Sequence, residues 1–110
     1  MWRVSDYVQV STAVQSRDDA MKLARAGVAG RLAASAQVVG PVGSVFWHRG
    51  ELGEGEEWQV IFYTTAELYD AIESWLGEDH PWDNPQVTAV PILRGSPGYL
   101  SWITRTVADV

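Results

Sequence analysis

The adjacent pair Asp79-His80 is the feature of this sequence best suited to binding a metal ion. An imidazole and a carboxylate are reasonable ligands for Cu(II), Ni(II) or Zn(II). Two ligands on one chain leave most coordination positions to water, so the pair predicts a weak divalent-cation site, for copper or zinc. The alternative is structural: the ring of His80 hydrogen-bonds backbone groups and fixes the turn that continues through Pro81 and Trp82.

A second polar group surrounds His48. With the acidic residues that follow, this histidine could form a hard-cation or mixed site at the end of a hairpin. Such charge runs also occur as solvated turns, and that alternative stays open. The acidic residues are Glu51, Glu54, Glu56 and Glu57.

Composition excludes several classes of function. The chain has no cysteine, so disulfides, thiolate metal sites and cysteine nucleophiles are absent. A formal net charge of -6 and a pI near 4.7 argue against nucleic acid or an anionic membrane as a partner. The sequence contains no phosphate-binding glycine loop, no G-x-S-x-G motif and no metalloprotease spacing of its two histidines. We therefore expect a binding protein and not an enzyme.

The 110 residues are enough for one domain, which we place at 1–110. No apolar run approaches the roughly 20 residues that span a bilayer, and the sequence starts without the pattern of a signal peptide. We therefore expect a cytoplasmic protein. Six tryptophans are more than one small core readily absorbs, so some are expected at an interface or a pocket.

Hydrophobic periodicity predicts the first half of the fold. Alternation predicts a strand over Tyr7 to Thr12, and Ser16 is the expected N-cap of a helix over about residues 17 to 30. Ser35 to Trp47 is expected to form one long strand, bent at Gly40-Pro41-Val42-Gly43. At roughly 3.3 Å per residue, this strand exceeds the diameter of a compact domain of this size, so a hairpin should overhang its own domain.

The second half of the sequence repeats the pattern. Residues 48–55 read as a short polar loop, and alternation around Val60 predicts the returning strand. Thr64 and Glu67 form a capping-box pattern for a helix that ends near Glu78. A strand over Val87 to Leu93 and a C-terminal helix that opens at Ser96-Pro97 complete the chain. The order β-α-β-β-α-β with an extra helix predicts an α+β, ferredoxin-like antiparallel sheet with both main helices on one face.

Specific residues along this order resemble the CutA divalent-cation tolerance family. The resemblance covers about Tyr7 to Ile103 and implies a cytoplasmic homotrimer, similar in shape to PII signalling proteins, with a role in tolerance to copper and other divalent cations. The segments that carry it are LARAGVAGRLAASAQVV, Phe46-Trp47-His48-Arg49-Gly50-Glu51, Tyr63-Thr64-Thr65, His80-Pro81-Trp82-Asp83-Asn84-Pro85 and Tyr99-Leu100-Ser101-Trp102-Ile103.

The resemblance also implies site residues. Copper-binding members have a cysteine at the position of Ser11 and two histidines at Asp79 and His80, so these three residues are the implied metal ligands. Aromatic side chains could line a ligand pocket at a subunit junction, or could serve core and interface packing. These aromatic residues are Trp47, Tyr63, Trp82, Tyr99 and Trp102.

Three functions are compatible with the sequence. The leading hypothesis is a non-enzymatic trimer that binds a metal or small ligand near His80. The second is a PII-like sensor of a nucleotide or metabolite, which a long mobile loop between the second and third strands would favour. The third is a structural trimer that scaffolds a partner protein.

Overall fold

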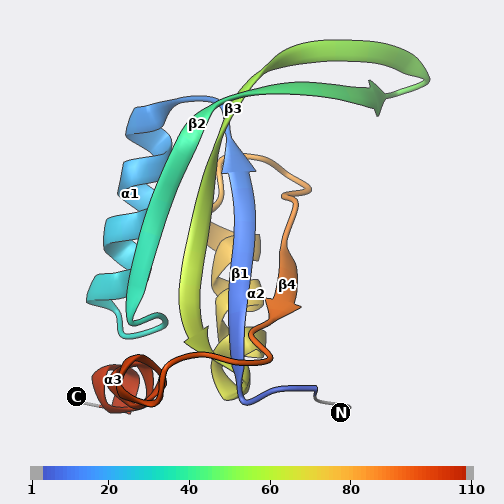
Figure 1. Cartoon of the computed structure of the whole chain (residues 1–110). Helices are drawn as coiled ribbons and strands as arrows, with labels where there is room; N and C mark the ends of the chain where they lie inside the picture. The colour runs from blue at the N-terminus through green and yellow to red at the C-terminus, as the bar shows by residue number, and fades with distance from the viewer. Residues whose placement is uncertain (1–3, 109–110) are drawn as a thin grey trace.

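Four antiparallel strands and three helices make up the structure, a computed structural model that describes residues 4–108. The sheet has the order β2-β3-β1-β4. Its strands are β1 (Tyr7–Val14), β2 (Ser35–His48), β3 (Glu51–Thr65) and β4 (Thr88–Pro91). Both main helices lie on one face of the sheet, as Figure 1 shows, and the third crosses one end of it. The helices are α1 (Arg17–Ala29), α2 (Tyr69–Asp79) and α3 (Pro97–Ala108). The predicted α+β, ferredoxin-like fold is therefore confirmed.

One hydrophobic core fills the space between the sheet and the two main helices. Alternate residues of β1 and β3 point into it, as the period of two in a strand requires. Gly27 allows α1 to approach the sheet closely, because a Cβ at this position would lie 2.6 Å from the ring of Phe62. The cluster contains Val8, Val10, Val14, Ala20, Leu23, Ala24, Ala33, Val60, Phe62, Ile72 and Leu76.

The start of α1 agrees with the sequence, whereas the start of α2 does not. Ser16 Oγ accepts a hydrogen bond of 3.1 Å from the backbone N–H of Asp19, which confirms the predicted N-cap. The predicted capping box at Thr64 is wrong. Thr64 is a buried residue of β3 whose hydroxyl donates to Leu32 O at 2.7 Å, so it cannot cap a helix. A 3-10 turn, η1 (Ala66–Leu68), separates it from α2.

The hairpin of β2 and β3 is longer and more regular than predicted. The strands stay paired as far as His48 and Glu51, so the expected loop over 48–55 is wrong. A tight turn at Arg49 and Gly50 joins them, and both residues have a positive φ, of 51° and 80°. This conformation is typical of two-residue hairpin turns. The polar sequence resembles a loop because both faces of this two-stranded ribbon are largely exposed to solvent.

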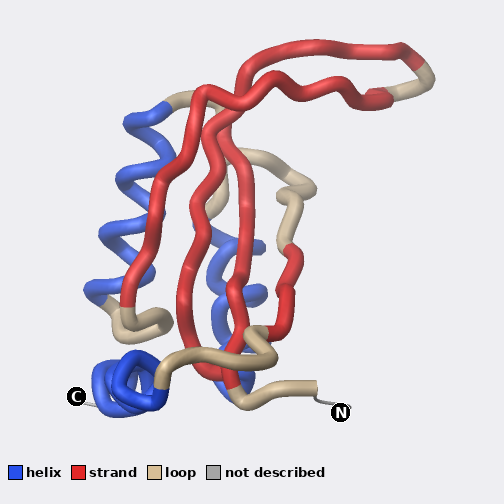
Figure 2. The backbone as a smooth tube through the Cα atoms, viewed as in Figure 1, coloured by secondary structure: helices blue, strands red, loops and turns tan. Residues whose placement is uncertain are grey.

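The hairpin bends where the sequence predicts and extends beyond the rest of the molecule. The register shifts between Val39 and Val42, and Figure 2 shows the paired strands turning away from the sheet. The longest dimension of the molecule is 44 Å against 28 and 24 Å for the others. The predicted overhang is therefore confirmed. Trp58 of β3 lies outside it and packs against the hydrophobic core.

No helix within residues 4–108 is long and apolar enough to cross a membrane.

Candidate functional site

His80 connects the end of α2 to the first strand through both nitrogens of its ring. The side chain is buried, and Nε2 lies 2.9 Å from Ala13 O. Nδ1 accepts a hydrogen bond of 3.0 Å from the backbone N–H of Trp82. An atom that accepts this bond carries no proton, so the neutral ring holds its proton on Nε2 and donates it to Ala13. Both nitrogens are therefore engaged within the chain.

The surroundings of His80 favour the uncharged ring. Burial lowers its pKa from the usual value, while the bond to Ala13 and the charge of Asp19 act in the opposite direction. The ring of Trp82 lies beside it, with centroids 5.2 Å apart. The hydrogen bonds are those expected of a histidine that fixes a turn.

The three residues implied as metal ligands do not form a ready metal site in one chain. Ser11 is a half-buried residue of β1 that pairs with Ile61 and Thr88, and its hydroxyl is no thiolate. Asp79 is exposed at the last position of α2. A metal ion at His80 would have to displace one of the hydrogen bonds of the ring. Within the described residues, no group of three or more histidine, cysteine or acidic side chains is placed to hold a metal.

The acidic residues around His48 lie on the ribbon that overhangs the sheet. His48 pairs with Glu51 next to the turn, and both side chains are exposed. Glu54 and Glu56 are also exposed, and Glu57 is partly buried. The structure spreads these side chains along a strand and does not gather them around one point.

The five aromatic residues predicted to line a pocket lie in separate places. Tyr99 and Trp102 stack on each other on α3, with centroids 5.8 Å apart. Trp82 lies against His80, and the Tyr63 hydroxyl donates to Gln37 at 2.8 Å. Trp47 pairs with Leu52 near the outer end of the hairpin, which lies at the opposite end of the molecule from α3 (Figure 1). A single chain does not bring all five together.

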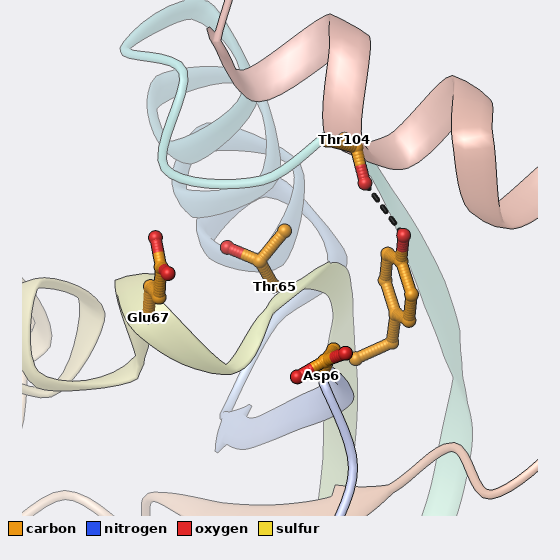
Figure 3. Close-up of a pocket in the computed structure, with 5 residues that line it drawn as sticks. Asp6, Thr65, Glu67 and Thr104 are labelled. Atoms are coloured by element: carbon orange, nitrogen blue, oxygen red, sulfur yellow. Dashed lines mark hydrogen bonds between the residues drawn. The ribbon is translucent and has the colours of Figure 1, made fainter.

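A cleft that the sequence did not indicate lies where β1, β3 and α3 meet (Figure 3). Its volume is about 280 Å³. The Tyr7 hydroxyl and Thr104 Oγ1 share a hydrogen bond of 2.6 Å across one side of it. Its lining residues come from three separate stretches of the sequence and match no motif, and the sequence pattern predicts a helix-capping role for Glu67. They are Asp6, Tyr7, Thr65, Glu67 and Thr104.

Comparison with known proteins supports a single family. Residues 8–106 match the model of the CutA1 divalent ion tolerance protein family. The divalent-cation tolerance protein CutA of Thermus thermophilus is 31% identical over 90 residues, which cover 82% of this chain and 87% of that protein. The chain spans 58% of the chloroplastic CutA 1 of rice and 51% of the mouse CutA, at 28% and 30% identity.

Solved structures of CutA proteins share the fold. The rice CutA1 structure superposes with a TM-score of 0.90 at 27% identity, covering 96% of this chain and 97% of that one. The CutA structure from Synechococcus elongatus gives a TM-score of 0.89 at 29% identity, covering 94% of this chain and 91% of that one. The family match covers nearly the whole chain, and the chain therefore belongs to the CutA1 divalent ion tolerance family.

Proposed function

We propose that this chain acts as a homotrimeric, non-enzymatic binding or signalling module of the cytoplasm that contributes to tolerance of divalent cations, including copper. The family membership supports the role in cation tolerance. We also propose that the chain assembles as a homotrimer, that the cations include copper and that the protein acts in the cytoplasm. On this proposal, the functional ligand is bound by the assembled trimer, where residues of neighbouring chains lie side by side.

The outer half of the hairpin carries this proposal. Its side chains expose much apolar surface that the chain itself does not cover: Val45 is 66% exposed, Trp47 74% and Leu52 61%. The register places these three on one face of the ribbon, since Trp47 pairs with Leu52 and Val45 lies two residues before Trp47. A contiguous apolar face of this kind usually marks an interface with another protein.

A second copy of the chain is a suitable partner for this face, because the chain also exposes apolar side chains on α3 and β4 for the hairpin to contact. Tyr99 and Trp102 are 40% and 38% exposed on α3, and Val90 is 57% exposed on the edge strand β4. Contacts between one surface of a chain and a different surface of the next generate a closed ring when the rotation between neighbours closes on itself.

The PII-like sensor receives less support than the cation-tolerance module. The sensor would be favoured by a long mobile loop between β2 and β3, but the connection is a two-residue turn between paired strands. A ribbon of this kind is better suited to a fixed contact than to closing over a ligand.

Light scattering coupled to size exclusion tests the assembly. We expect a particle of about three times the chain mass of 12.1 kDa at micromolar concentration. Trp47→Lys should shift the equilibrium towards monomer, because a charge would replace the centre of the apolar face. Ala26→Lys, at an exposed position of α1, is the matched control and should leave the trimer intact. A stable monomer of the unmodified protein would exclude the proposal.

A further inference from the structure

The outer half of the hairpin has two free backbone edges, and they differ in charge. Within the described residues, β2 pairs only with β3, and β3 pairs with β1 only from Trp58 onwards. A free strand edge presents unpaired N–H and C=O groups, and proteins commonly protect it with charged side chains. The outer part of β3 has this protection, since four of residues 51–57 are acidic. Residues 32–47, which include nearly all of β2, contain no charged residue.

The unprotected edge of β2 is also long and apolar. The strand has 14 residues, and most of its side chains are exposed. Val45 and Trp47, at 66% and 74% exposure, lie in its outer half. An edge with these properties is a template for pairing with another chain. The difference in charge between the two edges therefore identifies β2 as the edge that another strand covers.

The turn determines which backbone groups of β2 face this edge. His48 and Glu51 flank a two-residue turn, and in such a hairpin the flanking residues hydrogen-bond to each other. Hydrogen-bonded and non-hydrogen-bonded pairs then alternate along the antiparallel ribbon. The N–H groups of Val45 and Trp47 therefore point away from β3. The N–H of Glu54, which lies opposite Val45, points away from β2.

The edge strand β4 of a second copy is the strand that fits this edge. A three-membered ring joins two different surfaces of the chain, so β2 does not pair with another β2. β4 lies at the other side of the sheet, and all four of its residues are exposed (Figure 1). Residues 84–93 contain no charged residue. Ile92 donates its N–H to Tyr7 O, so alternation turns the N–H of Ala89 away from β1.

We propose that the free edge of β2 pairs with the free edge of β4 of a second copy, so that the sheet continues from one chain to the next. The inference rests on the proposed homotrimer and identifies the surfaces that form it. Each chain supplies one edge of each kind, so a closed ring leaves neither edge free. The acidic edge of β3 stays in solvent, because its carboxylates would be costly to bury.

Proline substitutions test the pairing, because proline has no N–H to donate. Val45→Pro removes an outward N–H of β2 and should raise the concentration at which the trimer dissociates by about tenfold or more. Glu54→Pro removes the outward N–H directly opposite, on the acidic edge, and should leave the trimer intact. Val45→Thr keeps the N–H and a β-branched side chain, so it should also retain the trimer. Light scattering at several concentrations measures dissociation, and thermal unfolding checks that each variant folds.

Two outcomes of these variants would overturn the pairing. Equal dissociation by Val45→Thr and Val45→Pro would assign the contact to the side chain instead of the backbone edge. Equal dissociation by Glu54→Pro and Val45→Pro would show that β2 is not the edge used.

Hydrogen exchange in the unmodified protein needs no variant. In the trimer, the protection factors of Val45, Trp47 and Ala89 should exceed that of Glu54 by about 100-fold or more. A trimer in which all these amides exchange equally fast would overturn the edge pairing and leave the proposed assembly standing. Protection of Val45 and Trp47 without Ala89 would overturn β4 as the partner strand. A protein that is monomeric in light scattering would contradict the proposed function itself.

Discussion

His80 Nε2 lies 2.9 Å from Ala13 O, and this contact joins the end of α2 to the end of β1 across 67 residues of sequence. The other ring nitrogen accepts from the backbone N–H of Trp82. A protonated ring has two donors and no acceptor, so protonation removes the bond to Trp82. The structure therefore uses the neutral form of His80.

The stability of the fold should fall when His80 is protonated. Burial lowers the pKa of His80 in the folded chain, whereas the unfolded chain has the ordinary value of about 6.5. The unfolded state therefore takes up the proton first as the pH falls. The contribution of His80 to the free energy of unfolding should be complete above about pH 6.5. It should be lost as the pH decreases towards the pKa of His80 in the folded chain. Urea unfolding across this range measures the effect.

Two variants separate this effect from other titrating groups. His80→Gln retains a donor for Ala13 but does not titrate, so it should flatten the dependence of the unfolding free energy on pH. His48→Gln changes an exposed histidine and should keep the dependence of the parent. Equal slopes for parent and His80→Gln would contradict the assignment.

Copper binding should be weak and selective for the oxidised ion. Thiolates select Cu(I), and the chain contains no cysteine. At Asp79 and His80, Cu(II) would have two ligands and would displace a hydrogen bond of the ring, so we expect a Kd no tighter than about micromolar, roughly -8 kcal/mol. Binding should weaken below about pH 6 as the imidazole protonates. Calorimetric titration with Cu(II) at several pH values measures the Kd and its dependence on pH.

The histidine variants test which residues bind the ion. His80→Ala should abolish Cu(II) binding, and His48→Ala should leave it nearly unchanged. If His80→Ala binds Cu(II) as well as the parent, the assignment is wrong and His48 with its neighbouring acids becomes the better candidate.

Trp58 lies opposite the bend of β2, where its ring covers Gly40. A Cβ at Gly40 would lie 2.6 Å from the indole, so Gly40→Ala should displace the ring and destabilise the fold. Gly43→Ala is the control, since a Cβ there meets no atom within 4 Å. Equal midpoints of thermal unfolding for Gly40→Ala and Gly43→Ala would contradict this packing.

Trp58→Ala should lower the free energy of unfolding by about 2 to 3 kcal/mol. This is less than the cost of removing a fully buried ring, because Trp58 is only partly buried.

Thr12 and Thr64 form a matched pair of fully buried threonines. Within the part of the chain that the structure describes, Thr12 Oγ1 has no hydrogen-bond partner, whereas Thr64 Oγ1 donates to Leu32 O. Thr12→Val should therefore be neutral or stabilising by about 1 kcal/mol. Thr64→Val should cost about 1 to 3 kcal/mol, because it leaves a carbonyl without its donor.

Denaturant unfolding of both variants at one pH gives the comparison directly. Equal destabilisation by the two substitutions would show that Thr12 has a partner in solution, such as a bound water molecule.

The sequence by itself determined the order of the elements and the faces that β1, β3, α1 and α2 bury. Alternation in β1 and β3 and the helical spacing around Leu23 and Leu76 depend on local geometry, so they can be read from neighbouring residues. The N-cap at Ser16 and the bend at Gly40 are also local, and the structure confirms both. The family resemblance rests on the same segments of the chain and is confirmed by the family match.

Contacts between distant segments were decided only by the tertiary structure. Thr64 has the pattern of a helix cap, but its hydroxyl is used by Leu32, 32 residues away, so sheet packing overrides the local preference. The sequence favours His80 as a metal ligand, but in the structure Ala13 and Trp82 engage both nitrogens of its ring. The cleft of Asp6, Glu67 and Thr104 exists only because the start of β1, the end of β3 and the middle of α3 lie together, which no spacing along the sequence encodes.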